Sequence, residues 1–142
     1  VVYYVRAGSR AGSMSLYRRV FDGDDAVTAA DGSNPDEQEL IEDVENLQVT
    51  YGVDTDNNPD GTRNFNIESY VRADEVTDWS RVIAVRMSLL LRSRDPLRDP
   101  DAVVADSASV NNVAITLPTT GDKFDRRVFT TTVALRNRIA NN

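Results

Sequence analysis

The sequence predicts a mainly β domain with antiparallel sheets, long irregular loops and little helix. Several segments alternate apolar and polar residues, which is typical of strands with one buried face. Segments rich in Gly, Pro, Asp and Asn separate them, and no helical stretch is long enough for the crossover that parallel strands require. The 142 residues, 40% of them hydrophobic, are enough for a single domain, residues 1–142, with its own core.

The first half of the chain contains three predicted strands. Residues 1–6 (VVYYVR) are rich in β-branched and aromatic side chains, and residues 14–21 (MSLYRRVF) alternate, so both are predicted strands. Residues 22–36 form an acidic loop whose charge density opposes burial. A helical turn or irregular segment is then expected up to about Asn46, followed by a strand over residues 47–53 (LQVTYGV).

The second half contains the strongest strand patterns. Residues 66–73 are a short strand candidate, and a helical turn capped by Asp74 is expected next. Residues 82–92 (VIAVRMSLLLR) are apolar on one face and partly apolar on the other, which predicts a central strand covered on both sides. A long loop with two Asp-Pro turns leads to the short segment 113–118, and residues 124–138 alternate as a terminal strand.

The composition excludes several classes of site. The chain has no Cys and no His, which rules out Cys nucleophiles, Ser-His-Asp triads, His- or Cys-based zinc sites and disulfides. Carboxylates are abundant, but none stands in an apolar setting that would mark a catalytic acid, so we expect no enzyme. No run approaches the eighteen or so apolar residues of a membrane span.

The net charge of −7 argues against a general nucleic-acid binder. The charge is also uneven, because residues 20–62 hold thirteen of the 23 acids and none of the sixteen bases. The front of the chain is therefore acidic and the rest is rich in arginine.

Three segments in order carry a family resemblance: LIEDVENLQVTYGVDTD (40–56), ADEVTDWSRVIAVRMSLLLRS (73–93) and RRVFTTTVALRNR (126–138). Together they resemble the PilW family of type IV pilus minor pilins, and more distantly the J-type minor pseudopilin of type II secretion. The opening VVYYVR and the later SLYRR are similar to that family's YY…LYRR strands.

The resemblance implies an α+β pilin-like head whose N-terminal leader and long hydrophobic helix are absent here, consistent with a start in a strand at Val1. It implies a structural subunit without an active site or cofactor, which primes or caps pilus assembly at the filament tip. Its partners would be other minor pilins and the tip adhesin, while the net charge speaks against nucleic acid as a partner. The missing helix would be its membrane contact, at the periplasmic face of the inner membrane before assembly and at the extracellular pilus tip afterwards.

A calcium-dependent adhesin or a carbohydrate-binding β domain is the alternative. Its candidate site is the loop VDTDNNPDGTRN (53–64), where Asp54, Asp56, Asn58 and Asp60 alternate and Glu68 follows on the next strand. Alternating oxygen ligands beside a glycine suit Ca²⁺, but the EF-hand spacing is not met. The same residues also suit a plain solvated turn, which the spacing favours.

Two further features bear on binding. The lone tryptophan, Trp79, is expected in the core, although an exposed tryptophan could stack on a sugar. Among the arginines around the central strand, Arg92 and Arg94 are predicted to bind a partner subunit, because arginine is enriched at protein interfaces and the acidic front half of a neighbour would complement it.

Overall fold

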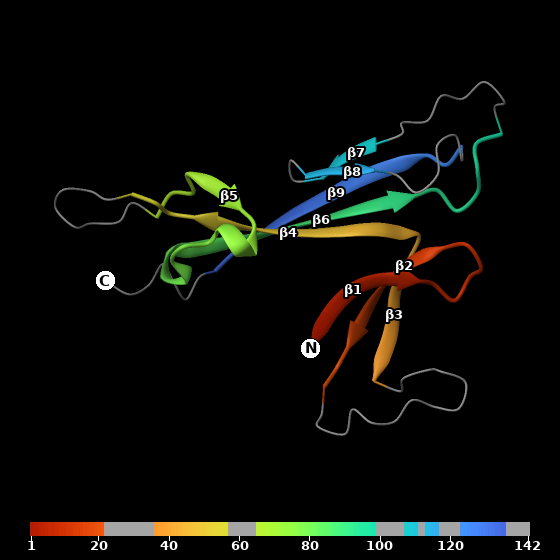
Figure 1. The fold of residues 1–142 in the computed structure, drawn as a ribbon, viewed down its shortest axis with the longest axis horizontal. Coiled ribbons are helices and arrows are strands. Elements are labelled where there is room, and N and C mark those ends of the chain that lie inside the picture. Colours follow the sequence, from red (N-terminus) through yellow and green to blue (C-terminus); the bar gives the residue numbers. More distant parts are fainter. Residues whose placement is uncertain (22–35, 57–64, 99–106, 111–112, 117–122, 136–142) are drawn as a thin grey trace.

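The computed structural model describes residues 1–21, 36–56, 65–98, 107–110, 113–116 and 123–135. These form antiparallel sheets of three, four and two strands, which confirms the predicted mainly β fold (Figure 1). The described helical segments are two single 3₁₀ turns, and neither is long or apolar enough to cross a membrane. Most of the predicted acidic loop, residues 22–35, lies outside the described residues.

The smaller sheet contains β1 (Val2–Ala7), β2 (Met14–Arg19) and β3 (Glu37–Glu42) in that order. Cross-strand pairing places Tyr4 opposite Tyr17, and their rings stack with centroids 6.2 Å apart. The β1–β2 turn contains Gly12 with φ of +74°, a left-handed conformation that glycine adopts without strain.

The prediction of a helical turn or irregular segment before Asn46 was wrong, since β3 pairs with β2 over residues 37–42. Leu40 and Ile41, which the local pattern would place on the apolar face of such a turn, are about 40% exposed. Pairing with β2 satisfies the backbone of the segment instead, so tertiary contact overrides the local helical pattern.

The larger sheet has the order β5-β4-β6-β9. It contains β4 (Val44–Val53), β5 (Ser69–Val71), β6 (Val82–Arg92) and β9 (Arg126–Ala134). The predicted strand over residues 82–92 is confirmed as β6, and it is central because it pairs with both β4 and β9. Register shifts at both ends of the β4–β6 ladder mark irregularities, and the first of them leaves Glu45 unpaired with β6.

A small hairpin of β7 (Ser107–Val110) and β8 (Val113–Thr116) lies beside the larger sheet. Val110 is fully buried against Leu90 of β6, and Ile115 packs on the same cluster. Strand β7 forms within the segment predicted as a long loop, because its apolar contact is with a residue distant in the chain.

The 3₁₀ turns η1 (Ala73–Glu75) and η2 (Trp79–Arg81) lead into β6. The predicted cap at Asp74 was wrong: Asp74 lies inside η1, and it is the Asp78 carboxylate that accepts a hydrogen bond from the Ser80 N–H, at 2.8 Å. The prediction that Trp79 is core was also wrong. It is 49% exposed, and its ring meets that of Tyr51 edge-on with centroids 4.9 Å apart.

The core of the described residues is small. More large apolar side chains are exposed than buried among these residues, and the buried ones gather around β2, both ends of β4, the start of β6 and Leu90. Contiguous exposed apolar positions on one face are more informative than scattered ones, because they mark a contact surface.

Candidate functional site

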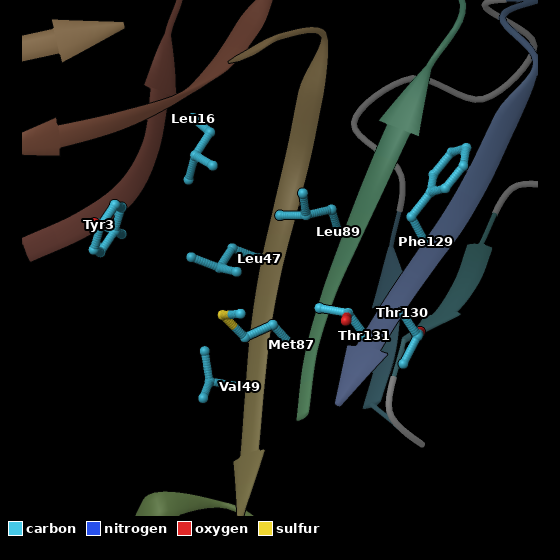
Figure 2. A pocket seen from close by; sticks show the side chains of 9 residues that line it. All are labelled: Tyr3, Leu16, Leu47, Val49, Met87, Leu89, Phe129, Thr130 and Thr131. Carbon is cyan, nitrogen blue, oxygen red and sulfur yellow. The ribbon is translucent and has the colours of Figure 1, made fainter. Parts of the chain in front are cut away.

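An apolar groove of about 800 Å³ lies between the smaller sheet (β1–β3) and the larger sheet (β5-β4-β6-β9) (Figure 2). Tyr3 of β1 and Leu16 of β2 line it from the smaller sheet. The remaining lining residues come from the larger sheet: Leu47, Val49, Met87, Leu89, Phe129, Thr130 and Thr131.

Strand register creates the groove face of the larger sheet. Residues directly opposite one another on antiparallel strands share a face, and every second residue along a strand returns to it. The ladder therefore aligns Leu47 with Leu89 and Phe129, and in the next row Val49 with Met87 and Thr131. A third row, Tyr51 with Val85 and Val133, extends the same face.

This face is open to solvent in the described structure. Met87 is 39% exposed at its centre, and Phe129 and Val133 are 58% and 50% exposed along β9. Such a continuous apolar patch is typical of a contact surface.

The opposite face of the same strands is more polar. Thr130 is among the residues that line the groove, but the register places its side chain on this opposite face, where its hydroxyl lies 2.7 Å from that of Ser88. On the same face the Arg86 guanidinium stacks 3.3 Å from the ring centroid of Tyr70. The exposed apolar side chains of this sheet are therefore concentrated on the groove face.

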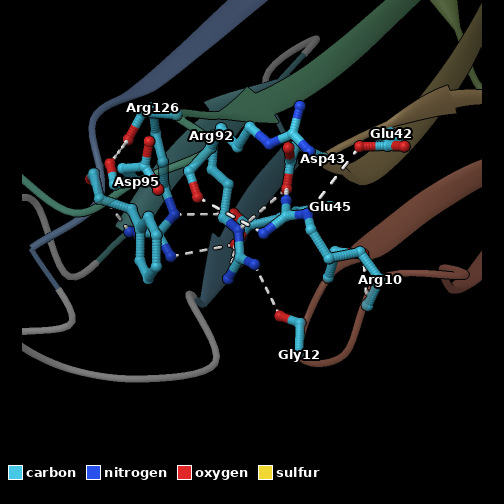
Figure 3. A network of polar contacts seen from close by, with 12 residues as sticks. Arg10, Gly12, Glu42, Asp43, Glu45, Arg92, Asp95 and Arg126 are labelled. Atoms are coloured by element: carbon cyan, nitrogen blue, oxygen red, sulfur yellow. Dashed lines mark hydrogen bonds and ion pairs between the residues drawn. The ribbon is translucent and has the colours of Figure 1, made fainter.

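An ion network ties the two sheets together near the end of the groove (Figure 3). Arg126 of β9 makes a bidentate ion pair with Glu45. Its Nε donates to Oε2 at 2.7 Å and a terminal guanidinium nitrogen donates to Oε1 at 3.1 Å, with both side chains almost fully buried. Arg92 of β6 lies 3.9 Å from the same carboxylate and 3.6 Å from Asp43.

The network reaches the β1–β2 turn of the smaller sheet. Arg10 in this turn pairs with Asp43, and Arg92 donates a 2.6 Å hydrogen bond to the Gly12 carbonyl. These contacts hold the smaller sheet against the larger one and so set the walls of the groove.

The two arginines predicted to bind a partner have different surroundings. The Arg92 side chain is only 11% exposed, its cation stacks 4.2 Å from the ring centroid of Phe124, and it forms ion pairs with Asp43 and Glu45 inside the molecule. Arg94 is exposed. Partner binding by both stays a prediction, and only at Arg94 can a substitution test it without disturbing the fold.

The described calcium candidates are Asp54, Asp56 and Glu68, while Asn58 and Asp60 lie outside the described residues. Asp54 is fully buried, and its carboxylate accepts a 3.1 Å hydrogen bond from the Asp56 N–H. Glu68 accepts a 2.7 Å bond from the Thr55 N–H. Within the described part of the chain no group of three or more acidic side chains is placed to hold a metal. The bond from the Asp56 N–H to Asp54 is that of an Asx-type turn, and calcium binding stays a prediction.

Sequence reasoning missed the groove itself. It treated β6 as covered on both sides, although Met87 and Leu89 face the groove. The available signal was three strands that each carry apolar residues at alternate positions. Choosing between a buried and an open face, however, requires knowing what packs on it.

The described residues form a β-rich domain with an open apolar face between its sheets. Residues 2–137 match the family model of PilW, the type IV pilus-assembly protein W, and the chain belongs to this family. It is a pilus-assembly family and is not known as enzymatic. Membership of an assembly family implies protein partners in the pilus system. Searches of curated proteins and of solved structures gave no match.

Proposed function

We propose that this chain is the head of a minor pilin that primes or caps the type IV pilus at the filament tip, without catalytic turnover. The observation that carries the proposal is the open apolar groove in a member of a pilus-assembly family. Its partners are other minor pilins and the tip adhesin. The head resides at the periplasmic face of the inner membrane before assembly and at the extracellular tip afterwards.

The groove supports contact with protein rather than with sugar. Its lining is aliphatic and aromatic apart from two threonines, and carbohydrate sites need many hydrogen-bonding groups. Fully burying a large apolar side chain that was exposed is worth roughly 1.5–3 kcal/mol. The half-exposed groove side chains gain part of this when a neighbouring subunit covers them, less the costs of association. Rows of such side chains across three strands therefore suit a stable subunit contact.

A substitution at the centre of the groove tests the proposal. Met87→Asp places a charge on the apolar face of β6, whereas Val128→Asp is a matched control at 42% exposure on the opposite face of β9. We expect Met87→Asp to reduce capture of purified minor pilins at least tenfold and to abolish surface pili and twitching motility in a complemented deletion strain. The control variant should retain both.

Equal binding by Met87→Asp and the wild type, with normal piliation, would overturn the proposed role of the groove. Thermal unfolding of both variants separates loss of binding from loss of fold, because both substituted side chains are already partly solvated.

A further inference from the structure

Strand β9 forms one edge of the larger sheet. The order β5-β4-β6-β9 places it last, and among the described residues no strand pairs with its outer side. Residues 127–134 are all exposed. The other edge, β5, is only three residues long, so β9 is the long open edge of this sheet.

Two hydrogen bonds show which backbone groups point outward. The Leu135 N–H donates to the Ile83 carbonyl at 2.8 Å, and the Ser93 N–H donates to the Asp125 carbonyl at 2.7 Å. Residues of an antiparallel strand alternate between bonding to one neighbour and to the other. Odd-numbered residues of β9 therefore bond to β6, while Val128, Thr130 and Thr132 direct their N–H and C=O groups to the free edge.

This edge lacks the features that usually protect one. Edge strands are commonly blunted by proline, bulges or charges. The β6–β9 register runs without a shift, and residues 128–133 (VFTTTV) contain neither proline nor a charge. An uninterrupted β-branched and aromatic edge of this kind is a template for another strand.

We infer that β9 pairs antiparallel with β9 of a second copy of the chain, centred on Thr131. In this register Phe129 lies opposite Val133 of the second copy, Thr130 opposite Thr132, and Thr131 opposite itself. The aromatic Phe129 thus pairs with the β-branched Val133, and threonine pairs with threonine. Both are favourable cross-strand combinations. Within residues 127–135 no two charges oppose, because Arg127 lies opposite Leu135. A shift by two residues loses the Phe129–Val133 pair.

The pairing joins the groove faces of the two copies. Phe129, Thr131 and Val133 stay on the groove side, so two four-stranded sheets become one eight-stranded sheet with a continuous apolar face. When the same edge of two copies pairs across a two-fold axis, each copy uses up its free edge. The result is a closed dimer and not a fibre. This inference goes beyond the proposed function and does not depend on it.

Single cysteines can measure the register, because the chain has no cysteine of its own. In the proposed pairing Thr131 is a non-hydrogen-bonded pair, with Cα atoms about 4.5 Å apart, within disulfide range. We expect Thr131→Cys to form a covalent dimer under mild oxidation. Phe129→Cys alone should not, since its two copies lie about 14 Å apart at roughly 3.4 Å per residue. A mixture of Phe129→Cys and Val133→Cys should cross-link.

A proline provides the second test. Thr132→Pro removes an outward N–H and leaves the bonds to β6 intact, as edge strands tolerate. Thr132→Val is the matched control, since it loses the same hydroxyl but keeps the N–H. By sedimentation velocity we expect the wild type and Thr132→Val to dimerise with rising concentration, and Thr132→Pro to weaken dimerisation about tenfold or more.

A wild type that stays monomeric at all concentrations would overturn the inference, and so would Thr131→Cys cross-linking no faster than Phe129→Cys. If Thr132→Pro does not fold, the cysteine measurements still decide. A monomer whose binding to other pilins is lost on Thr132→Pro would show that the edge accepts a different chain, and this result would also overturn self-pairing.

Discussion

At the scale of single residues, the Glu39 carboxylate of β3 depends on Gly8, whose lack of a side chain leaves room for it. Its carboxylate accepts a hydrogen bond from the Ser9 N–H at 3.3 Å. A Cβ at Gly8 would lie 2.3 Å from the Ser15 hydroxyl and 3.0 Å from Glu39, so the cluster needs glycine there. The neighbouring Ser15 hydroxyl, and then that of Ser9, hold the pKa of Glu39 below its usual 4.5.

A pKa lowered in the folded state means that ionised Glu39 stabilises the fold at pH above about 4.5, and that this contribution is lost as the pH falls through the lower folded value. We expect Ser15→Ala to destabilise the protein more at pH 7 than at pH 3. Urea unfolding across this range gives the difference in unfolding free energy between the variant and the wild type. Glu39→Gln is the control, in which the Ser15→Ala effect should no longer depend on pH; a pH-independent effect in the wild-type background would contradict the assignment.

At the scale of elements, a bulge and two arginines join β4, β6 and β9. Register places Arg92 directly opposite Arg126, two like charges that would repel. The irregularity at Glu45 inserts a carboxylate between them. The local break in the ladder therefore stabilises the sheet end that carries the inter-sheet network.

Glu45→Gln should destabilise the fold by about 3–5 kcal/mol, because it leaves the buried Arg126 cation without its partner. The double variant Glu45→Leu/Arg126→Met should recover most of the loss, since it removes both charges. The neighbouring Arg127→Ala is the matched control: its ion pair with Asp125 is largely solvated and should cost less than about 1 kcal/mol. Chemical denaturation measures all three, and a Glu45→Gln cost as small as the control would refute the role.

The strand patterns with strict alternation were predictable. Residues 82–92 and most of 124–138 follow period two over many residues, so β6 and β9 could be recognised from the chain alone. Strand β3 could not, because its local pattern also fits a helical face and only its pairing with β2 decides. The turn capped by Asp78 was misplaced because Asp74 is an equally good capping residue a few positions earlier.

At the scale of the whole molecule, the arginine-rich part of the chain is largely committed to internal contacts. Arg92 and Arg126 are buried in the network, whereas Arg94 is exposed beside it. Contact with an acidic neighbour therefore depends on exposed positions such as Arg94.

We expect Arg94→Glu to weaken association with partner pilins about two- to fivefold at low salt, with the difference shrinking as salt rises. Binding kinetics at two ionic strengths measure it. Arg72→Glu, an exposed arginine engaged by Asp74 and Glu75, is the control and should have a smaller effect. An equal loss for both variants, or a loss insensitive to salt, would remove Arg94 from the interface.

The sequence by itself determined the mainly β class, the absence of His- and Cys-based chemistry, and the ordered motifs typical of PilW, because these depend on residue type and local period. Only the tertiary structure decided that the shared face of Leu47, Met87 and Phe129 is open. It alone also brought Glu45 to Arg126, 81 positions away. Alternation indicates which side chains share a face, but what covers that face depends on segments distant in the chain, and no local pattern encodes their position.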